Sequence, residues 1–165
     1  MMQIKVVGQR DLVVVSAALQ DAIISVRDLA FLEDQQQFQA VFNRFMWERV
    51  ARRPWMRVMA ALRVDHVTGA TANKIDFRDK DRLLCFLALH WHDPSIDRAG
   101  QGELPGMPGK VPQINHAGQL VFTFAAEQTI TLEVNRLSLR VRDNGEPWPT
   151  DQKPRHDSTD LDDED

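Results

Sequence analysis

Apolar and polar residues alternate along much of this chain, and that two-residue period predicts β-strands. The clearest case is a pair of apolar segments, 23–32 and 38–43, on either side of a wholly polar bend at 33–36. The bend lacks the Asn-Gly or Asp-Gly pair that is typical of a two-residue turn. We therefore predict two antiparallel strands that are joined by a longer loop.

Other segments repeat the same alternation between turn-forming or charged residues. Residues 83–92 are apolar at nearly every position, which predicts a strand that is buried on both faces. Residues 119–125 and 129–134 predict a hairpin, with Leu120, Phe122 and Phe124 on one face. The remaining predicted strands are residues 4–7, 58–67 and 70–77.

One helix is predicted near the N-terminus, over residues 11–21. Asp11 occupies a suitable N-cap position, and Leu12, Val15 and Leu19 follow at helical spacing. Residues 135–143 fit two alternatives. Alternating Leu137, Leu139 and Val141 favour a strand, whereas an Asn before them and Gly145 after them would suit the ends of a helix.

These elements predict an α+β fold, with a mainly antiparallel, curved sheet or partly closed barrel and an N-terminal helix. A C-terminal helix over 135–143 would give the layout of a pleckstrin-homology-like barrel, although that is an analogy of fold alone. We expect a single domain over residues 1–156, with a Pro/Gly-rich loop at 94–118. That loop is interpreted as a mobile insertion.

Charge is distributed unevenly. The net charge is −4, but residues 157–165 (DSTDLDDED) contain six acids and no base. Without them, basic residues slightly outnumber acidic ones. So polar a segment cannot bury enough apolar surface to offset its ordering entropy, and we predict that it is a disordered acidic tail.

Four blocks of sequence resemble one family of short bacterial proteins, domain-of-unknown-function family 2948. They are VSAALQDAIISVRDLAF (15–31), NRFMWE (43–48), RVDHV (63–67) and ITLEVNRLSLRVRDNGEPW (130–148). The resemblance covers most of residues 4–156. It implies no catalytic or ligand-binding residue.

Histidines at the end of the predicted strand 83–92 form a candidate metal site. His90 and His92 are two residues apart and would project from one face, where Asp93 or His66 could add a ligand. A divalent transition metal such as zinc would accept this set. The alternative, which we favour, is a strand end that turns polar as it leaves the core.

A second candidate is a cluster of arginines that runs from Arg44 to Arg63 and is interleaved with Phe45, Trp47 and Trp55. Arginine beside tryptophan is typical of protein interfaces and also of phosphate and base contacts. The plainer interpretation is a solvated connector. The acidic tail could fold back weakly over this cluster. The candidate binding residues are Arg44, Arg49, Arg52, Arg53, Trp55 and Arg57.

The chain shows no signal peptide or membrane-spanning stretch, and its single cysteine, Cys85, rules out an internal disulfide framework. We therefore expect a cytoplasmic protein that does not bind membranes. Catalytic and nucleotide-binding motifs are missing from the sequence.

These observations favour a non-catalytic binding or protein-interaction module without a cofactor, although whether the protein catalyses a reaction stays open. The expected partner is another protein or a second copy of the chain, and nucleic acid is less favoured. The alternative function is a metal-binding protein or metal-assisted hydrolase that uses His90, His92 and His66.

Overall fold

A computed structural model describes residues 1–95 and 113–155, in which ten strands and one α-helix are assigned. The helix is α1 (Gln9–Leu19), and three short 3₁₀ turns are η1 (Val26–Asp28), η2 (Glu33–Gln35) and η3 (Trp47–Arg49). The strands are β1 (Gln3–Val6), β2 (Ile23–Ser25), β3 (Leu29–Leu32), β4 (Gln37–Phe45), β5 (Trp55–Val64), β6 (Val67–Asn73), β7 (Leu83–His92), β8 (Gly118–Phe124), β9 (Gln128–Val134) and β10 (Leu139–Thr150).

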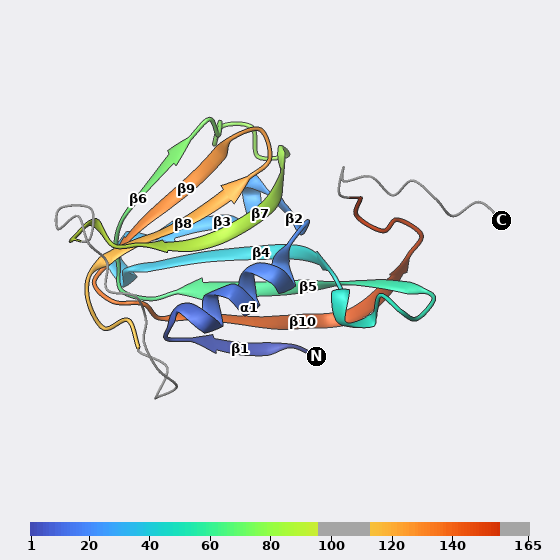
Figure 1. The fold of residues 1–165 in the computed structure, drawn as a ribbon. Coiled ribbons are helices and arrows are strands. Elements are labelled where there is room, and N and C mark those ends of the chain that lie inside the picture. The colour runs from blue at the N-terminus through green and yellow to red at the C-terminus, as the bar shows by residue number, and fades with distance from the viewer. Residues whose placement is uncertain (96–112, 156–165) are drawn as a thin grey trace.

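The strands form one sheet in the order β1-β10-β5-β4-β2-β7-β8-β9-β6, with β3 paired beside β4. Every strand pairing is antiparallel. The sheet folds over at the short β2, so β1, β10, β5 and β4 make one layer and β7, β8, β9 and β6 make the other (Figure 1). β1 and β6 are the two edge strands of this order. They do not pair with each other in the described residues, so the sheet does not close. The predicted α+β fold with a curved antiparallel sheet and an N-terminal helix is confirmed.

Two neighbouring corners carry the chain between the layers. One joins β5 to β6 through Asp65 and His66, and the other joins β9 to β10. His66 has a φ of 62°, in the left-handed region that a sharp reversal requires. Its carbonyl oxygen accepts a hydrogen bond from the amide of Asn135 at 3.1 Å, and the amide of Asp65 donates to the carbonyl oxygen of Ser138 at 2.9 Å. Each corner therefore braces the other.

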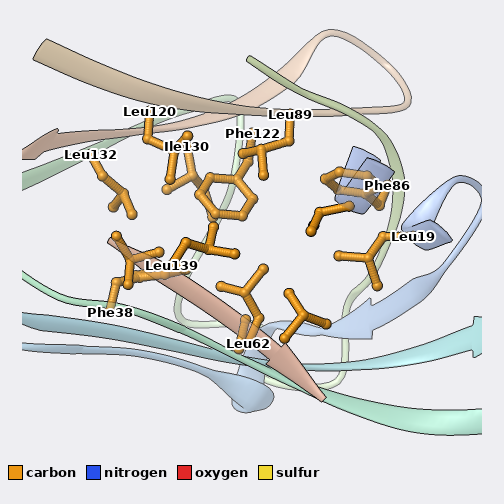
Figure 2. Close-up of a cluster of buried hydrophobic side chains, with 14 of the residues drawn as sticks. Leu19, Phe38, Leu62, Phe86, Leu89, Leu120, Phe122, Ile130, Leu132 and Leu139 are labelled. Atoms are coloured by element: carbon orange, nitrogen blue, oxygen red, sulfur yellow. The ribbon is translucent and has the colours of Figure 1, made fainter. Parts of the chain in front are cut away.

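The core fills the space between the two layers of the sheet, where side chains from both layers point toward one another (Figure 2). Phe38 of the first layer lies 5.5 Å from Phe122 of the second, ring centre to ring centre, and Phe42 lies 5.6 Å from Phe86. The buried residues alternate along strands such as β5, β8 and β9, because a strand sends successive side chains to opposite faces.

Helix α1 lies in front of the opening between the layers (Figure 1). It buries Leu12, Val15 and Leu19, which are the residues that the helical spacing predicted. The predicted N-cap is wrong, since the helix begins after Gly8 and Asp11 occupies the first turn. The Asp11 carboxylate instead reaches back and accepts hydrogen bonds from the Val7 and Gly8 amides, at 3.1 and 3.2 Å.

Three strand predictions need correction. Residues 23–32 are split by η1 into β2, which pairs with β4 and β7, and β3, which pairs with β4 alone. The strand predicted at 70–77 is β6, which starts at Val67 and pairs with β9 in the other layer. β7 is buried on one face only, because Leu83 and Leu87 are 65% and 45% exposed.

Of the two alternatives for residues 135–143, strand or helix, the structure shows a strand. β10 begins at Leu139, and residues 135–143 contain no helix. The pleckstrin-homology-like layout that depended on such a helix is therefore wrong. Most of the predicted loop at 94–118 and all of the predicted tail at 157–165 lie outside the described residues. Within the described end of the loop, Ile114 is buried and its amide donates to the Val7 carbonyl oxygen at 2.8 Å.

Candidate functional site

Arg44, which was predicted to belong to a binding surface, is fully buried. Its side chain has an exposed fraction of 0%. Nε lies 2.7 Å from Oδ1 of Asp143 and Nη2 lies 2.8 Å from Oδ2, while Nη1 and Nη2 also reach the Glu48 carboxylate at 3.1 and 2.8 Å. The guanidinium is thus shared between two carboxylates and is not available to a partner. The prediction is wrong for this residue.

The alternation of the strands explains this burial. Phe38, Ala40, Phe42 and Arg44 are the even positions of β4, which face the core, and Asp143 faces the same space from β10. Arg44 therefore enters the inner space at the end of the hydrophobic core, and Asp143 meets it there. The Met2 amide also donates to Oδ2 of Asp143 at 2.7 Å, so β1 and β10 are tied together at this point.

Opposing effects set the protonation of this cluster. Burial alone would raise the pKa of the Asp143 carboxyl, but hydrogen bonds from Arg44 and Met2 and the adjacent positive charge lower it below its ordinary value. Burial likewise acts to lower the pKa of Arg44, and Asp143 and Glu48 outweigh that effect and raise it. Burial also acts to raise the pKa of Glu48, but its contacts with Arg44 lower it below its ordinary value, so all three groups are charged at neutral pH.

The other predicted binding residues gather near the start of β5. Arg49, Arg52 and Arg53 are exposed, and the Arg53 guanidinium carbon lies 3.6 Å from the ring centre of Trp55. The Trp55 indole N–H donates to the Val50 carbonyl oxygen at 3.1 Å, which fixes the ring. A shallow hollow of about 590 Å³ adjoins this stack and is lined by Arg53, Trp55, Asp151, Gln152, Lys153 and Arg155.

Arg57 is half-buried and is held by its own sheet. Its Nη1 donates to the backbone oxygen and to the side-chain oxygen of Asn43, at 3.3 and 3.2 Å. Of the six predicted binding residues, the structure therefore brings Arg53 and Trp55 into contact, leaves Arg49 and Arg52 exposed nearby, and commits Arg44 and Arg57 to internal contacts.

The three candidate metal ligands are not assembled into a site. His90 and His92 lie at the end of β7, and His66 lies in the corner after β5. Within residues 1–95 and 113–155, no three His, Cys, Asp or Glu side chains lie close enough together to hold a metal ion. Asp93 instead accepts hydrogen bonds from Ser95 and lies 2.7 Å from Nε2 of His116, and these contacts lower its pKa.

The structure reveals a different candidate on the outer face of the first layer. A groove of about 570 Å³ crosses β1, β10, β5 and β4. Strand register sets its floor, since Ala61 of β5 is the cross-strand partner of both Arg142 on β10 and Val41 on β4. The small Ala61 side chain leaves the face hollow between its larger neighbours.

Four basic residues line this groove. Lys5, Arg140 and Arg63 stand side by side on β1, β10 and β5, and Arg142 lies two residues from Arg140. Arg63 is paired with Asp65, whose Oδ1 lies 3.1 Å from its Nε. Lys5, Arg140 and Arg142 are exposed and have no acidic partner among the described residues. The groove therefore carries uncompensated positive charge, which can hold an anionic ligand.

A local signal for part of this groove exists in the sequence. In the segment 139–143 (LRVRD), two arginines alternate with apolar residues, which indicates a strand with a basic outer face. The rest could not be read locally. Lys5 and Arg63 reach the groove only because β10 pairs with β1 on one side and with β5 on the other.

The groove and the Arg53–Trp55 stack lie on the same face of β5. Trp55, Arg57, Met59, Ala61 and Arg63 occupy alternate positions, and their pairing with β4 from Arg57 to Val64 is regular. Side chains at alternate positions share a face. This outer face therefore runs from the groove at one end of β5 to the tryptophan at the other.

In the part of the chain that the structure describes, no helix combines the length and the hydropathy needed to cross a membrane. Comparisons with curated proteins and with solved structures give no match. The sequence does match the family described as "Protein of unknown function (DUF2948)", over residues 3–105 and 109–156. Since that match covers most of the chain, the protein belongs to this family, as its sequence blocks predicted.

Proposed function

We propose that this protein is a non-catalytic interaction module that binds an extended, acid-rich polypeptide segment in the groove across β1, β10, β5 and β4. The observation that supports it best is the set of Lys5, Arg140 and Arg142. These three cations lie on two adjacent strands, line one hollow, and have no acidic partner among the described residues. Cations left unpaired around a concave surface favour an anionic partner.

The spacing of the cations favours an extended peptide. Arg140 and Arg142 are alternate residues of one strand, about 6.6 Å apart, and an extended peptide presents its alternate side chains at the same interval. Two acids separated by one residue could therefore contact both arginines at once. Arginine also binds a carboxylate through two parallel hydrogen bonds, which adds geometric specificity.

The lining of the groove argues against single-stranded nucleic acid. Proteins that bind it combine a basic groove with aromatic side chains on which the bases stack. The residues that line this groove are Gln3, Ile4, Lys5, Gln39, Ala40, Val41, Ala61, Leu62, Arg63, Arg140, Val141 and Arg142, and none of them is aromatic.

The absence of catalysis belongs to the same proposal. The groups in the groove are basic or amide side chains on an apolar floor, without a nucleophile paired with a base. A cytoplasmic location is also part of the proposal, and the single cysteine of the chain supports it.

A binding measurement with matched probes tests the proposal. The probe is a fluorescein-labelled peptide of alternating glutamate and serine, its control is the same peptide with glutamine in place of glutamate, and a labelled oligothymidylate represents nucleic acid. Fluorescence anisotropy at low salt should show binding of the acidic peptide only. Tighter binding of the oligothymidylate would instead make this a nucleic-acid site, and equal binding of the glutamine peptide would exclude charge recognition.

Variants localise the site. Arg140→Glu with Arg142→Glu should abolish binding of the acidic peptide, because it reverses two of the three unpaired cations. Arg10→Glu with Arg82→Glu makes the same change in net charge at two exposed arginines outside the groove. This control pair should retain most of the affinity. If both pairs weakened binding equally, the peptide would be responding to overall charge and the groove would not be its site.

A further inference from the structure

We propose that the acidic C-terminal segment, residues 157–165, binds in the same groove as an intramolecular ligand, which an external acid-rich partner must displace. The inference rests on the proposed function, because it assigns the groove an occupant of the same chemistry from within the chain. It also changes the location suggested by the sequence, where the tail could fold back weakly over the arginine cluster that begins at Arg44. That guanidinium is already paired with two carboxylates.

The point where the described chain ends makes the groove reachable. Arg155 and Trp55 line the same hollow, so the tail departs beside the start of β5. Ala61, on the floor of the groove, is six residues further along the same face of β5, about 20 Å away. The ten residues that follow Arg155 can span up to about 35 Å when extended. The distal part of the tail is therefore long enough to enter the groove.

The position of the acids within the tail agrees with this distance. Five of the six acids lie at or after Asp160, which an extended chain can place about 17 Å from Arg155. Asp160, Asp162 and Glu164 alternate along the sequence, as do Asp163 and Asp165. Either set can present carboxylates at the interval that separates Arg140 from Arg142, so the tail has the pattern that the groove is proposed to bind.

Tethering makes even a weak contact effective. A short linker gives its ligand an effective concentration in the millimolar range, so a tail with a dissociation constant of similar size would occupy the groove much of the time. Salt should release it, since exposed charges are screened over about 8 Å at physiological ionic strength. We therefore expect the tail to occupy the groove part of the time, and strong or multivalent acidic partners to displace it.

Neutralising the tail in the full-length chain tests the inference. All six acids are replaced by their amides: Asp157→Asn, Asp160→Asn, Asp162→Asn, Asp163→Asn, Glu164→Gln and Asp165→Asn. Affinity for the alternating glutamate peptide at low salt should rise about threefold or more, because the competitor is lost. A matched control makes six amide substitutions at exposed acids in the body, namely Asp28, Glu33, Asp34, Asp79, Glu133 and Glu146, which also removes six negative charges. A similar gain in that control would show a general charge effect and overturn the inference.

Cross-linking tests proximity directly. In a Cys85→Ser background, Ala61→Cys places a thiol on the groove floor and Asp163→Cys places one in the tail. Mild oxidation at low salt should form an intramolecular disulfide that moderate salt suppresses. The control pairs Asp163→Cys with Thr71→Cys, an exposed position on β6 in the other layer. Equal cross-linking in both pairs would overturn the inference.

The two proposals fail in distinguishable ways. If Arg140→Glu with Arg142→Glu abolishes peptide binding while tail neutralisation and cross-linking show no effect, the groove is a binding site without an internal competitor. If cross-linking is specific but the external peptide never binds, even to the neutralised-tail variant, the proposed function fails and the groove serves only the tail.

Discussion

Arg44 and Asp143 form a bidentate ion pair, and both side chains are completely buried. The two N–O distances are 2.7 and 2.8 Å. The pair links β4 to β10 across the intervening β5, at one end of the core. Taking two charges out of water is costly, and the attraction between them repays that cost only when both partners are present.

Removing Arg44 alone should therefore cost far more than removing both partners. Arg44→Met alone is expected to lower the free energy of unfolding by about 3–5 kcal/mol, because it leaves the Asp143 carboxylate buried without its cation. Asp143→Leu alone should cost less than Arg44→Met, because Arg44 keeps its ion pair with Glu48. The double variant should lie much nearer the wild type, since Met and Leu fill a similar volume and Glu48, which is 51% exposed, can remain solvated. Urea denaturation at neutral pH gives these values. A double variant as unstable as the sum of the single ones would contradict this account.

The same pair predicts a pH dependence. The pKa of Asp143 is lowered in the folded protein below its ordinary value of 3.8. Its contribution to stability is therefore complete above that value and is lost as the pH falls through the lower, folded-state pKa. The Arg44→Met, Asp143→Leu double variant lacks this group and should lose less stability than the wild type below about pH 4. Thermal unfolding from pH 7 to pH 2 checks this, and parallel curves throughout would count against it.

Gly118 is required by its contact with Trp91. A Cβ at position 118 would lie 2.2 Å from the indole ring, so Gly118→Ala should destabilise the fold by about 1–3 kcal/mol. Gly69→Ala is the matched control, because a Cβ there would meet the Glu133 side chain at an ordinary 3.7 Å. Chemical denaturation of both variants measures the difference.

A rescue variant makes the cause of that effect specific. Trp91→Leu removes the ring that an alanine at 118 would strike. In the Trp91→Leu background, Gly118→Ala should therefore lower the free energy of unfolding by less than it does in the wild type. If Gly118→Ala cost the same stability in both backgrounds, backbone conformation rather than the tryptophan would explain the requirement for glycine.

Filling the groove should block binding without changing its charge. Ala61→Leu adds bulk to the floor between Arg142 and Val41, and it should greatly weaken binding of the alternating glutamate peptide. Stability should stay within about 0.5 kcal/mol, because the position faces outward. Ala72→Leu, at an exposed site on β6, is the control and should leave binding unchanged. Unaltered affinity in Ala61→Leu would place the peptide elsewhere.

Local patterns predicted the elements whose periodicity was strong. The helix with Leu12, Val15 and Leu19 inward and the hairpin of β8 and β9 were both confirmed, because a single buried stripe or face specifies each. The predicted strand at 23–32 failed, since η1 interrupts an apolar run whose Val26 amide donates to the carbonyl oxygen of Arg82, far away in sequence. A distant hydrogen-bond partner leaves no trace in local alternation.

In the candidate site, too, local sequence failed wherever a contact with a distant strand decided the outcome. Arg44 looked like a surface residue because arginines surround it in sequence, and only the position of Asp143 on a distant strand explains its burial. Conversely, Arg63 belonged to the arginine-rich segment, but nothing in the local sequence linked it to Lys5. They meet because β1 and β5 flank β10.

By itself, the sequence determined which segments alternate, where the helix lies, that the sheet is antiparallel and that acids are concentrated at the C-terminus. These features depend on neighbouring residues in the chain, and periodicity records them. Only the tertiary structure decided which strands adjoin. It therefore decided that four basic side chains from three strands line one groove, and that Arg44 is buried beside Asp143. The physical reason is that cross-strand neighbours are set by the cooperative packing of two layers around a shared core, which no single segment encodes.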